Sequence, residues 1–343
     1  MKLAIDTEKN EKVAVKIVKI TKTSQETELA LKHEYEVMKS LSHKNILKVY
    51  DYIEKTDYLT RKGTKLPVAI LAMELAQGGE LFSYMPKPQP YTEDEARSFF
   101  HELIEVIQFL HLQGICHGNI KPENLLFDND FNLKITDFGR SINLANPTPF
   151  DQYSDSTSFG FYSPEKLAKH KNYDVMGEDL FAAAIVLFNM VIGSPPFSSA
   201  NINDLRYKHL VNNRNDIFWD FHEKGKKSKS SKEFKDLMNS MLAFDPTQRL
   251  TLSEIKAHPW YLETSPSKGK FKALLKEKKK ANDEKLEKQK VGLIQLKQAK
   301  TKSEEDRLEP MIERRAFTGF NQMRDLELDT VILFISKQGS KCF

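Results

Sequence analysis

His117-Gly118-Asn119-Ile120-Lys121-Pro122-Glu123-Asn124 is the stretch that decides the fold of this chain, and Asp137-Phe138-Gly139 follows it. The apolar stripe of a long helix comes before it, formed by Phe99, Leu103, Val106, Ile107 and Leu110. Two short strand-like segments come after it, Leu125–Phe127 and Leu133–Ile135. The stretch is therefore a loop between a helix and a strand pair, and it carries an imidazole, two amides and an ammonium group.

The 343 residues can hold one large domain or two smaller ones with extensions, and the 40% hydrophobic content is enough for a core. Cys116 and Cys342 cannot make a disulfide scaffold, which indicates a reducing compartment. Met1–Lys16 mixes charged and apolar residues, so we expect no signal peptide. The longest apolar run, Leu180–Ile192, is interrupted by Asn189 and is short for a bilayer, which predicts a buried helix and no transmembrane segment. We expect a cytoplasmic protein, with the nucleus as the alternative.

The net charge of +4 conceals an uneven distribution. Between Lys268 and Lys302, thirteen lysines stand against four acidic residues, which gives this stretch a charge of +9. By difference, the rest of the chain carries about −5. The basic isoelectric point is thus a property of the tail, so we expect no nucleic-acid-binding surface across the domain.

The apolar pattern divides the chain into three parts. Residues 1–76 are predicted to be strand-rich with one helix, because Val13–Val18 and Val68–Met73 are strand-like runs and Leu29–Leu41 has helical spacing. From residue 77 to residue 262 the pattern becomes helical.

The helical part begins with a capping box at Thr92-Glu93-Asp94-Glu95. Further helices are expected at Leu180–Ile192, Phe234–Leu242 and Leu252–Ala257. Residues 263–343 form a lysine-rich tail, in which Lys270–Lys302 is a helix candidate with too few apolar residues for a core of its own. Val331–Ile335 is strand-like and suggests a small C-terminal module.

Together these motifs resemble the signature of a protein kinase, which reads His-Arg-Asp-Leu-x-x-x-Asn and then Asp-Phe-Gly. The likeness covers roughly residues 1–262, and six motifs in order identify the family where one tripeptide would be weak evidence. Ile115-Cys116-His117, Lys121-Pro122-Glu123-Asn124 and His258-Pro259-Trp260 are closest to the calcium/calmodulin-dependent group of Ser/Thr kinases. The resemblance implies an α+β, two-lobed fold, with a β-rich small lobe at residues 1–76, truncated at its start, a helical large lobe at residues 77–262 and a lysine-rich helical tail.

The resemblance also implies an ATP site. Lys16, in Val-Ala-Val-Lys, matches the strand lysine that holds the α- and β-phosphates, and Glu34 matches the helix glutamate that pairs with it. Outside this context the two would be solvated surface residues. Ala14 and Leu126 match the apolar residues above and below the adenine ring, although they fit an ordinary core equally well.

Three more positions join the nucleotide site by the same resemblance. Glu74 and Ala76, in the segment Met73–Ala76, match the hinge whose backbone bonds the edge of adenine. Glu80 matches a position that bonds the ribose or a basic substrate side chain. Together with Glu123 it suggests a preference for basic substrates, and a surface carboxylate is the equal alternative.

Asp137 and Asn124 match the residues that hold Mg²⁺, and Lys121 matches the lysine that neutralises the γ-phosphate. The resemblance further implies scaffold roles that do not depend on catalysis. Three groups take these roles: the ion pair Glu165–Arg249, Asp179 beneath the catalytic loop (residues 117–124), and an internal spine of Met38, Phe138 and His117.

Asn119 stands where the family has its catalytic aspartate. Its amide oxygen can accept a hydrogen bond from a substrate hydroxyl but cannot take up the proton. General-base catalysis is typically worth ~10²–10⁴-fold, so we expect severe impairment rather than complete loss. Gly118 replaces the arginine that binds a phosphorylated activation segment. We therefore expect little activation by phosphorylation of Ser154, Ser156, Thr157 or Ser158.

The glycine-rich loop that covers the phosphates in this family has no counterpart, because no glycine precedes Gly63. That loop should end a few residues before Met1. We expect the sequence to be truncated, since Met1–Ala4 falls on the family's second strand. The alternative is an enzyme without the loop, with weaker nucleotide binding.

Three functions stay open from the sequence. The first is an impaired kinase homologue that binds Mg-ATP and acts on a protein substrate or a regulatory partner. The others are an active ATP-dependent Ser/Thr kinase and a non-catalytic scaffold. For the tail we prefer a solvated helix or linker. The alternative is a docking segment for calmodulin or an acidic surface, anchored by Phe271, Leu274 and Leu275.

Overall fold

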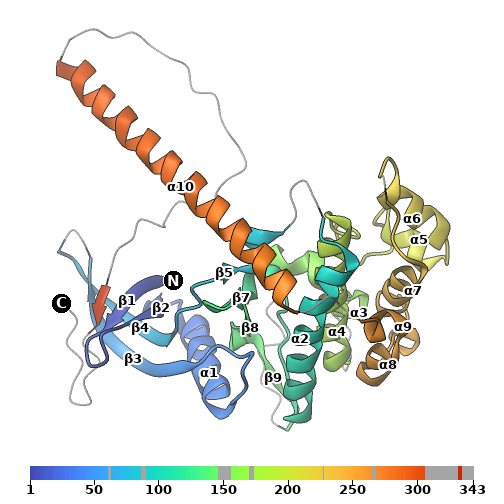
Figure 1. Cartoon of the computed structure of the whole chain (residues 1–343). Helices are drawn as coiled ribbons and strands as arrows, with labels where there is room; N and C mark the ends of the chain where they lie inside the picture. Colours follow the sequence, from blue (N-terminus) through green and yellow to red (C-terminus); the bar gives the residue numbers. More distant parts are fainter. Residues whose placement is uncertain are drawn as a thin grey trace.

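The computed structural model describes residues 1–60, 63–85, 90–145, 156–169, 174–226, 228–264, 268–305 and 331–333. A small lobe built on one β-sheet stands beside a larger, helical lobe, and the long helix α10 extends away from the large lobe (Figure 1). The chain therefore has the two-lobed α+β architecture predicted from its sequence.

The small lobe is a five-stranded sheet with the strand order β10-β1-β2-β4-β3. Its strands are β1 (Lys2–Asp6), β2 (Glu11–Lys19), β3 (Val49–Leu59), β4 (Lys65–Glu74) and β10 (Val331–Leu333). Side chains alternate along β2, because successive residues of a strand point to opposite faces. Val13 and Val15 are buried with Ile70 on one face, which leaves Ala14 and Lys16 on the other.

Helix α1 (Gln25–Ser40) turns one face inward, with Leu31, Glu34 and Met38 buried at helical spacing. Leu31 and Met38 belong to the main hydrophobic core, which continues into the large lobe. The same face that packs α1 thus carries Glu34 toward the interior.

The large lobe is arranged around α2 (Glu93–Leu112) and α4 (Val175–Ile192). The capping box predicted at Thr92 is present, since Thr92 and Glu95 exchange side-chain and backbone hydrogen bonds. Among the described residues one helix is long and apolar enough to cross a membrane. It is α4, and 78% of it is buried inside the lobe, as expected for the core helix predicted there.

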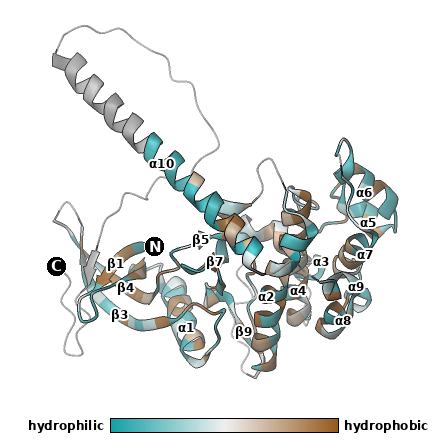
Figure 2. Cartoon of the chain, viewed as in Figure 1, coloured by the Kyte–Doolittle hydropathy of each residue, from teal (hydrophilic) through white to brown (hydrophobic). Residues whose placement is uncertain are grey.

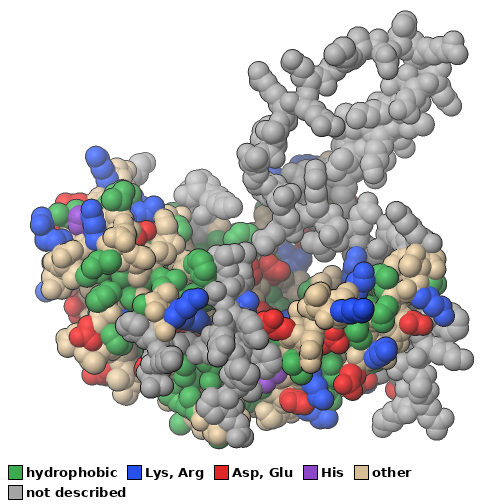
Figure 3. Space-filling view, turned by 180° about the vertical axis from the view of Figure 1, so that it is seen from behind, with side chains coloured by type: hydrophobic (Ala, Val, Ile, Leu, Met, Phe, Trp, Pro, Cys, Tyr) green, Lys and Arg blue, Asp and Glu red, His purple; other side chains and the backbone are tan. Residues whose placement is uncertain are grey.

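The remaining helices of the large lobe are α3 (Pro164–Leu167), α5 (Tyr207–Val211), α6 (Asn215–Glu223), α7 (Lys232–Met241), α8 (Leu252–Ala257) and α9 (Pro259–Leu262). Hydrophobic residues are frequent in α2 and α4, whereas the coloured part of α10 mixes hydrophilic with hydrophobic residues (Figure 2). On the rear face, basic and acidic side chains are interspersed on both lobes (Figure 3).

Short elements on either side of α2 shape the site. They are β5 (Gly79–Glu80), β6 (Ile115–Cys116), β7 (Leu125–Phe127), β8 (Leu133–Ile135) and β9 (Ile142–Asn143), with the 3₁₀ turns η1 (Leu81–Tyr84), η2 (Pro122–Asn124), η3 (Phe138–Arg140) and η5 (Ser156–Phe161). Of these, β5 and η1 come before α2, and the others lie between α2 and α4. The predicted strand pair is confirmed as β7 and β8. Because β7 and β8 are antiparallel, they present the catalytic loop and Asp137 at the same end of the pair.

Helix α10 (Lys268–Glu305) begins as part of the large lobe. Phe271 and Leu275 are buried in the main core, and Phe271 packs edge-on against Tyr91. The Lys278 ammonium lies 3.8 Å from the centre of the Tyr91 ring. Along its first turns, α10 is therefore a packed helix rather than the solvated helix or linker that we preferred. Within the predicted strand Val331–Ile335, Phe334 and Ile335 lie outside the described residues.

Candidate active site

Asp179 on α4 holds the catalytic loop from below. Its Oδ2 accepts hydrogen bonds from His117 N at 2.8 Å and from His111 Nε2 at 3.0 Å, and its Oδ1 accepts from Gly118 N at 2.9 Å. Burial alone would raise the pKa of Asp179, but hydrogen bonds and charge from His111 hold it below its usual range. The loop backbone is thus fixed by a buried carboxylate.

Gly118 adopts a left-handed conformation with φ of +70°. A Cβ at this position would lie 2.8 Å from the Arg140 carbonyl oxygen, which is too close for any side chain. The Gly118 carbonyl accepts a hydrogen bond from Lys166 Nζ at 3.0 Å. The absence of the family's arginine is therefore built into the backbone here.

His117 is part of the predicted spine, and it contacts Phe138. Its Nε2 donates to the Thr136 carbonyl at 2.9 Å, and its Nδ1 accepts from Asn119 N at 3.2 Å, which defines a neutral tautomer. Burial lowers the pKa of His117 accordingly. Its ring meets Phe138 edge-on at 4.8 Å. His117 thus connects the catalytic loop to the turn that carries Asp137.

Lys16, Glu34 and Asp137 come together from β2, α1 and the turn after β8. The Lys16 Nζ lies 2.7 Å from Glu34 Oε2 and 2.8 Å from Asp137 Oδ1. Burial is the main cause that raises the pKa of Glu34 to about 7. Burial would also raise the pKa of Asp137, but Lys16 holds it below its usual range. One ammonium therefore serves two carboxylates, and of the two it is Glu34 whose pKa is raised.

Asn119 bonds on both sides of the site. Its Nδ2 donates to Asp137 Oδ2 at 2.9 Å, and its backbone carbonyl accepts from Asn124 Nδ2 at 2.8 Å. Its Oδ1 accepts from the Ser158 hydroxyl at 3.4 Å. Lys121 Nζ donates to the same hydroxyl at 2.8 Å. Asn119 and Lys121 therefore already present their polar atoms to a serine hydroxyl.

Ser158 is a site residue whose role the sequence did not reveal. We considered it only as a phosphorylation position, yet it is buried and bonded to Lys121. No pattern in the sequence distinguishes it from its neighbours Ser156 and Thr157, because only the path of η5 carries it to the catalytic loop. Ser154 lies outside the described residues.

The apolar positions predicted around adenine come from both lobes. Ala14, Ala76 and Leu126 are partly buried and pack against the edge of the main core. The side chain of Glu74 has another role, since its Oε1 lies 3.0 Å from Lys134 Nζ. Glu80 pairs with Leu126 in the β5–β7 ladder.

Glu80 and Glu123 form an acidic pair at the rim of the site. Burial is the main cause that raises the pKa of Glu80, and the charge of Glu123 adds to the shift. Among the described residues, Glu123 Oε2 is buried without a hydrogen-bond partner. A basic group is the natural complement of this pair.

Two ion pairs are made by residues of α3. The two terminal guanidinium nitrogens of Arg249 donate to Oε1 and Oε2 of Glu165, at 2.5 and 2.7 Å, as predicted. Sequence reasoning missed the second pair, in which Lys166 Nζ lies 3.3 Å from the buried Glu178. Burial raises the pKa of Glu178 despite this lysine. A lysine directly after Ser-Pro-Glu was the one available signal.

The donor set at the end of β8 fits Mg²⁺. Asp137 offers a carboxylate and Asn124 an amide oxygen, and hard oxygen ligands are those that Mg²⁺ prefers. The amide nitrogen of Asn124 is already engaged by the Asn119 carbonyl, which leaves the oxygen as its metal-facing donor. When bound beside Asp137, the metal would neutralise part of the charge of the nucleotide's phosphates.

His111, Cys116 and Asp179 also lie close enough together to share an ion, with ligand atoms within 4.8 Å. However, both oxygens of Asp179 already accept bonds from the loop backbone. We therefore assign this cluster to the scaffold.

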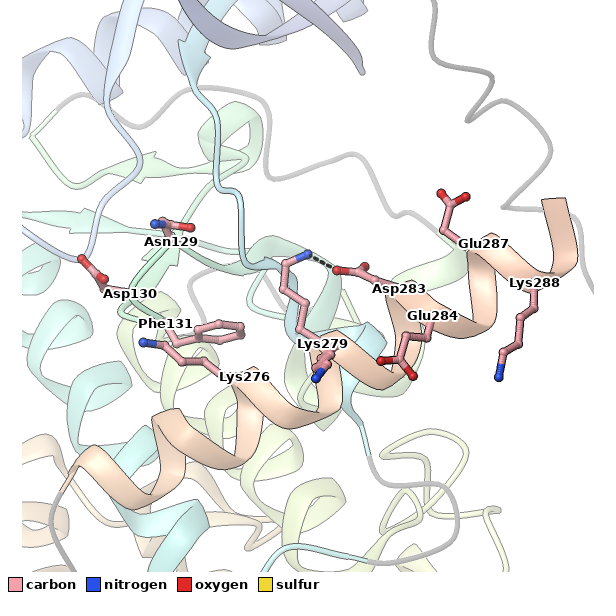
Figure 4. Close-up of a pocket in the computed structure, with 10 residues that line it drawn as sticks. Asn129, Asp130, Phe131, Lys276, Lys279, Asp283, Glu284, Glu287 and Lys288 are labelled. Atoms are coloured by element: carbon pink, nitrogen blue, oxygen red, sulfur yellow. Dashed lines mark hydrogen bonds and ion pairs between the residues drawn. The ribbon is translucent and has the colours of Figure 1, made fainter. Parts of the chain in front are cut away.

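An open groove of about 880 Å³ lies between α10 and the turn that joins β7 to β8 (Figure 4). The Phe131 ring lies in it, with Lys279 and Asp283 from α10 bonded to each other at 2.9 Å. Its lining mixes lysines with acids and includes none of the catalytic-loop residues. The groove is therefore separate from the candidate active site.

Comparison with known proteins agrees with this geometry. The sequence pattern described as "Protein kinase domain" matches residues 1–261. The chain is 34% identical over 255 residues to the probable serine/threonine-protein kinase MARK-A of Dictyostelium discoideum, covering 74% of this chain and 22% of that protein. It is 32% identical over 267 residues to the maternal embryonic leucine zipper kinase of Xenopus tropicalis, covering 77% of this chain and 37% of that protein. It thus spans well under half of either relative, and it belongs to the protein kinase family.

Proposed function

We propose that the chain binds Mg-ATP between its lobes and that its transfer of phosphate to protein serine or threonine is impaired by Asn119. One observation carries the proposal. The Asn119 amide oxygen and the Lys121 ammonium both bond a serine hydroxyl, that of Ser158. A substrate hydroxyl can therefore be oriented here, while no carboxylate stands at position 119 to receive its proton.

The chemistry follows from these groups. Transfer forms a bond between the substrate oxygen and the γ-phosphorus and breaks the bond to the β–γ bridging oxygen. Lys16 and Lys121 counter the phosphate charge, and Asp137 with Asn124 would hold the metal. Without an aspartate at position 119, the hydroxyl proton must pass to water or to the phosphoryl oxygens. Loss of general-base catalysis costs about 10²–10⁴-fold in rate.

A radiolabel transfer assay with Mg²⁺-ATP and a basic substrate protein tests the proposal. We expect Asn119→Asp to raise the rate by about 10²-fold or more, and Asp137→Ala to abolish what remains. Robust transfer by the parent chain that Asp137→Ala removes would support the alternative, an active kinase. Absence of nucleotide binding in a thermal-shift titration would support the other alternative, a scaffold that does not use nucleotide.

Glu80 and Glu123 favour a substrate with a basic side chain near its phosphoacceptor. The support is the buried, unsatisfied Glu123 Oε2 among the described residues and the raised pKa of Glu80. Glu80→Gln together with Glu123→Gln should weaken binding of an arginine-containing peptide and leave binding of nucleotide unchanged. Equal affinity of the parent chain for arginine and alanine peptides, or an arginine preference that the double variant keeps, would contradict this preference.

We also propose that calmodulin or an acidic surface docks on the tail, and the burial of the tail's apolar anchors limits how this can happen. The apolar anchors Phe271 and Leu275 are buried against the large lobe. A partner that grips them must first detach the start of α10, whereas an acidic surface can meet exposed lysines without detachment. Binding of calmodulin that survives Phe271→Ala would contradict the anchored mode.

A further inference from the structure

We propose that Asn119 stabilises the Asp137 carboxylate by a hydrogen bond from within the protein, so that this site binds nucleotide with only weak dependence on Mg²⁺. The inference rests on the proposed function, because it concerns how the same site takes its nucleotide. The ligand class is a nucleoside di- or triphosphate, with or without Mg²⁺.

The geometry around Asp137 carries the proposal. Lys16 donates to its Oδ1 at 2.8 Å and Asn119 donates to its Oδ2 at 2.9 Å. Each carboxylate oxygen therefore has a donor from the chain itself. Asn119 is also held in place, because the residue is 4% exposed and its backbone carbonyl accepts a hydrogen bond from Asn124 Nδ2.

The choice between asparagine and aspartate decides what a cation does here. An aspartate at position 119 would place a carboxylate oxygen about where the amide nitrogen now lies, close to Asp137 Oδ2. Two like charges at such a distance repel, and a divalent cation would relieve the repulsion. Asparagine instead places a hydrogen-bond donor there, so no repulsion remains for a metal to relieve.

The same contact competes with a metal. A cation that binds Asp137 Oδ2 must first displace the Asn119 amide. A hydrogen bond to a charged group is strong enough to shift an equilibrium about tenfold. Linkage is reciprocal, so a contact that weakens the metal's hold in the nucleotide complex equally weakens the effect of the metal on nucleotide affinity. Lys16 and Lys121 remain to meet the phosphates directly.

Calorimetric titration with ADP, in EDTA and then in MgCl₂, tests this inference without any catalytic turnover. The quantity compared is the ratio of the two dissociation constants. We expect a ratio within about threefold for the parent chain and about tenfold or more for Asn119→Asp. Asn239→Asp is the matched control, because Asn239 accepts a bond from Trp219 Nε1 at 3.0 Å, far from the site, and keeps an acceptor after the change.

Asn119→Ala provides a second variant if Asn119→Asp does not fold. It removes the amide donor without adding charge, so its ratio should also exceed that of the parent. Equal ratios in the parent and in a folded position-119 variant overturn the inference and leave the proposed function intact. No ADP binding by the parent in either buffer overturns both.

Discussion

Two charge clusters in this molecule differ in their balance of acidic and basic groups. In the large lobe, Glu165 and Arg249 form a one-to-one pair, with both side chains 6% exposed. Between the lobes, one ammonium, Lys16, lies against the two carboxylates of Glu34 and Asp137. The charges of the first cluster cancel, whereas the second cluster has two acidic groups for one cation.

The two clusters respond differently to burial. Burial alone would raise the pKa of Glu165, but the bidentate Arg249 holds it below its usual range. Burial is the main cause that raises the pKa of Glu34 to about 7, and the nearby charge of Asp137 adds to it, whereas Lys16 lowers it. The pair in the large lobe is thus neutral in itself, whereas the cluster between the lobes holds one acidic group in excess, Glu34, with a raised pKa.

The largest expected effect comes from breaking the complete pair. Arg249→Met leaves the Glu165 carboxylate buried without its cation, and such a change typically costs about 3–5 kcal/mol. Urea denaturation should show this loss in the free energy of unfolding. The double variant Glu165→Gln with Arg249→Met should recover part of the loss. If Lys16→Met destabilises the chain more than Arg249→Met does, the comparison between the clusters fails.

A second effect concerns the loop that the scaffold holds. Gly118→Ala forces a side chain into a left-handed conformation and against the Arg140 carbonyl, so we expect a loss of about 2–3 kcal/mol in unfolding free energy. Gly114→Ala is the matched control, since Gly114 also has a positive φ but has nothing within 4 Å of the added carbon. A Gly118 variant no less stable than the Gly114 variant would show that the loop yields easily.

The smallest effect is a dependence on pH from the cluster between the lobes. Because the pKa of Glu34 is raised from its usual 4.5 to about 7, its contribution to stability is full below about pH 4.5 and is lost as pH rises through 7. We expect a loss of at most about 2.5 kcal/mol between pH 5 and pH 8. The Glu34→Gln variant should lack this slope in denaturation midpoints. Identical slopes for parent and variant would assign the titration to another group.

Much of the fold could be predicted from sequence because it rests on local patterns. The β-branched run at Val13–Val18 predicted β2, and the hydroxyl and carboxylate of Thr92–Glu95 predicted the start of α2. The short helices α5 and α6 were not predicted, because their apolar residues are packed by neighbours rather than repeated along a long face. Phe271 and Leu275 looked like a sparse stripe because the core that covers them belongs to α2.

The candidate site divides in the same way. The residue types at positions 16, 34, 119, 121, 124 and 137 could be recognised from their order and spacing. The partners of those residues could not, because Ser158 reaches Lys121 only through the path of η5, and Lys166 reaches Gly118 only through the packing of α3. Contacts between segments far apart in sequence leave no period or spacing to detect.

The sequence by itself determined that this chain is a kinase-like protein with an amide in place of its catalytic carboxylate, because side-chain chemistry at position 119 does not depend on packing. Only the tertiary structure decided what that amide does. The folded chain places Asn119 Nδ2, in the loop before β7, at 2.9 Å from Asp137 Oδ2, in the turn after β8. A hydrogen bond between those two segments exists only once α4 and the strand pair have positioned both.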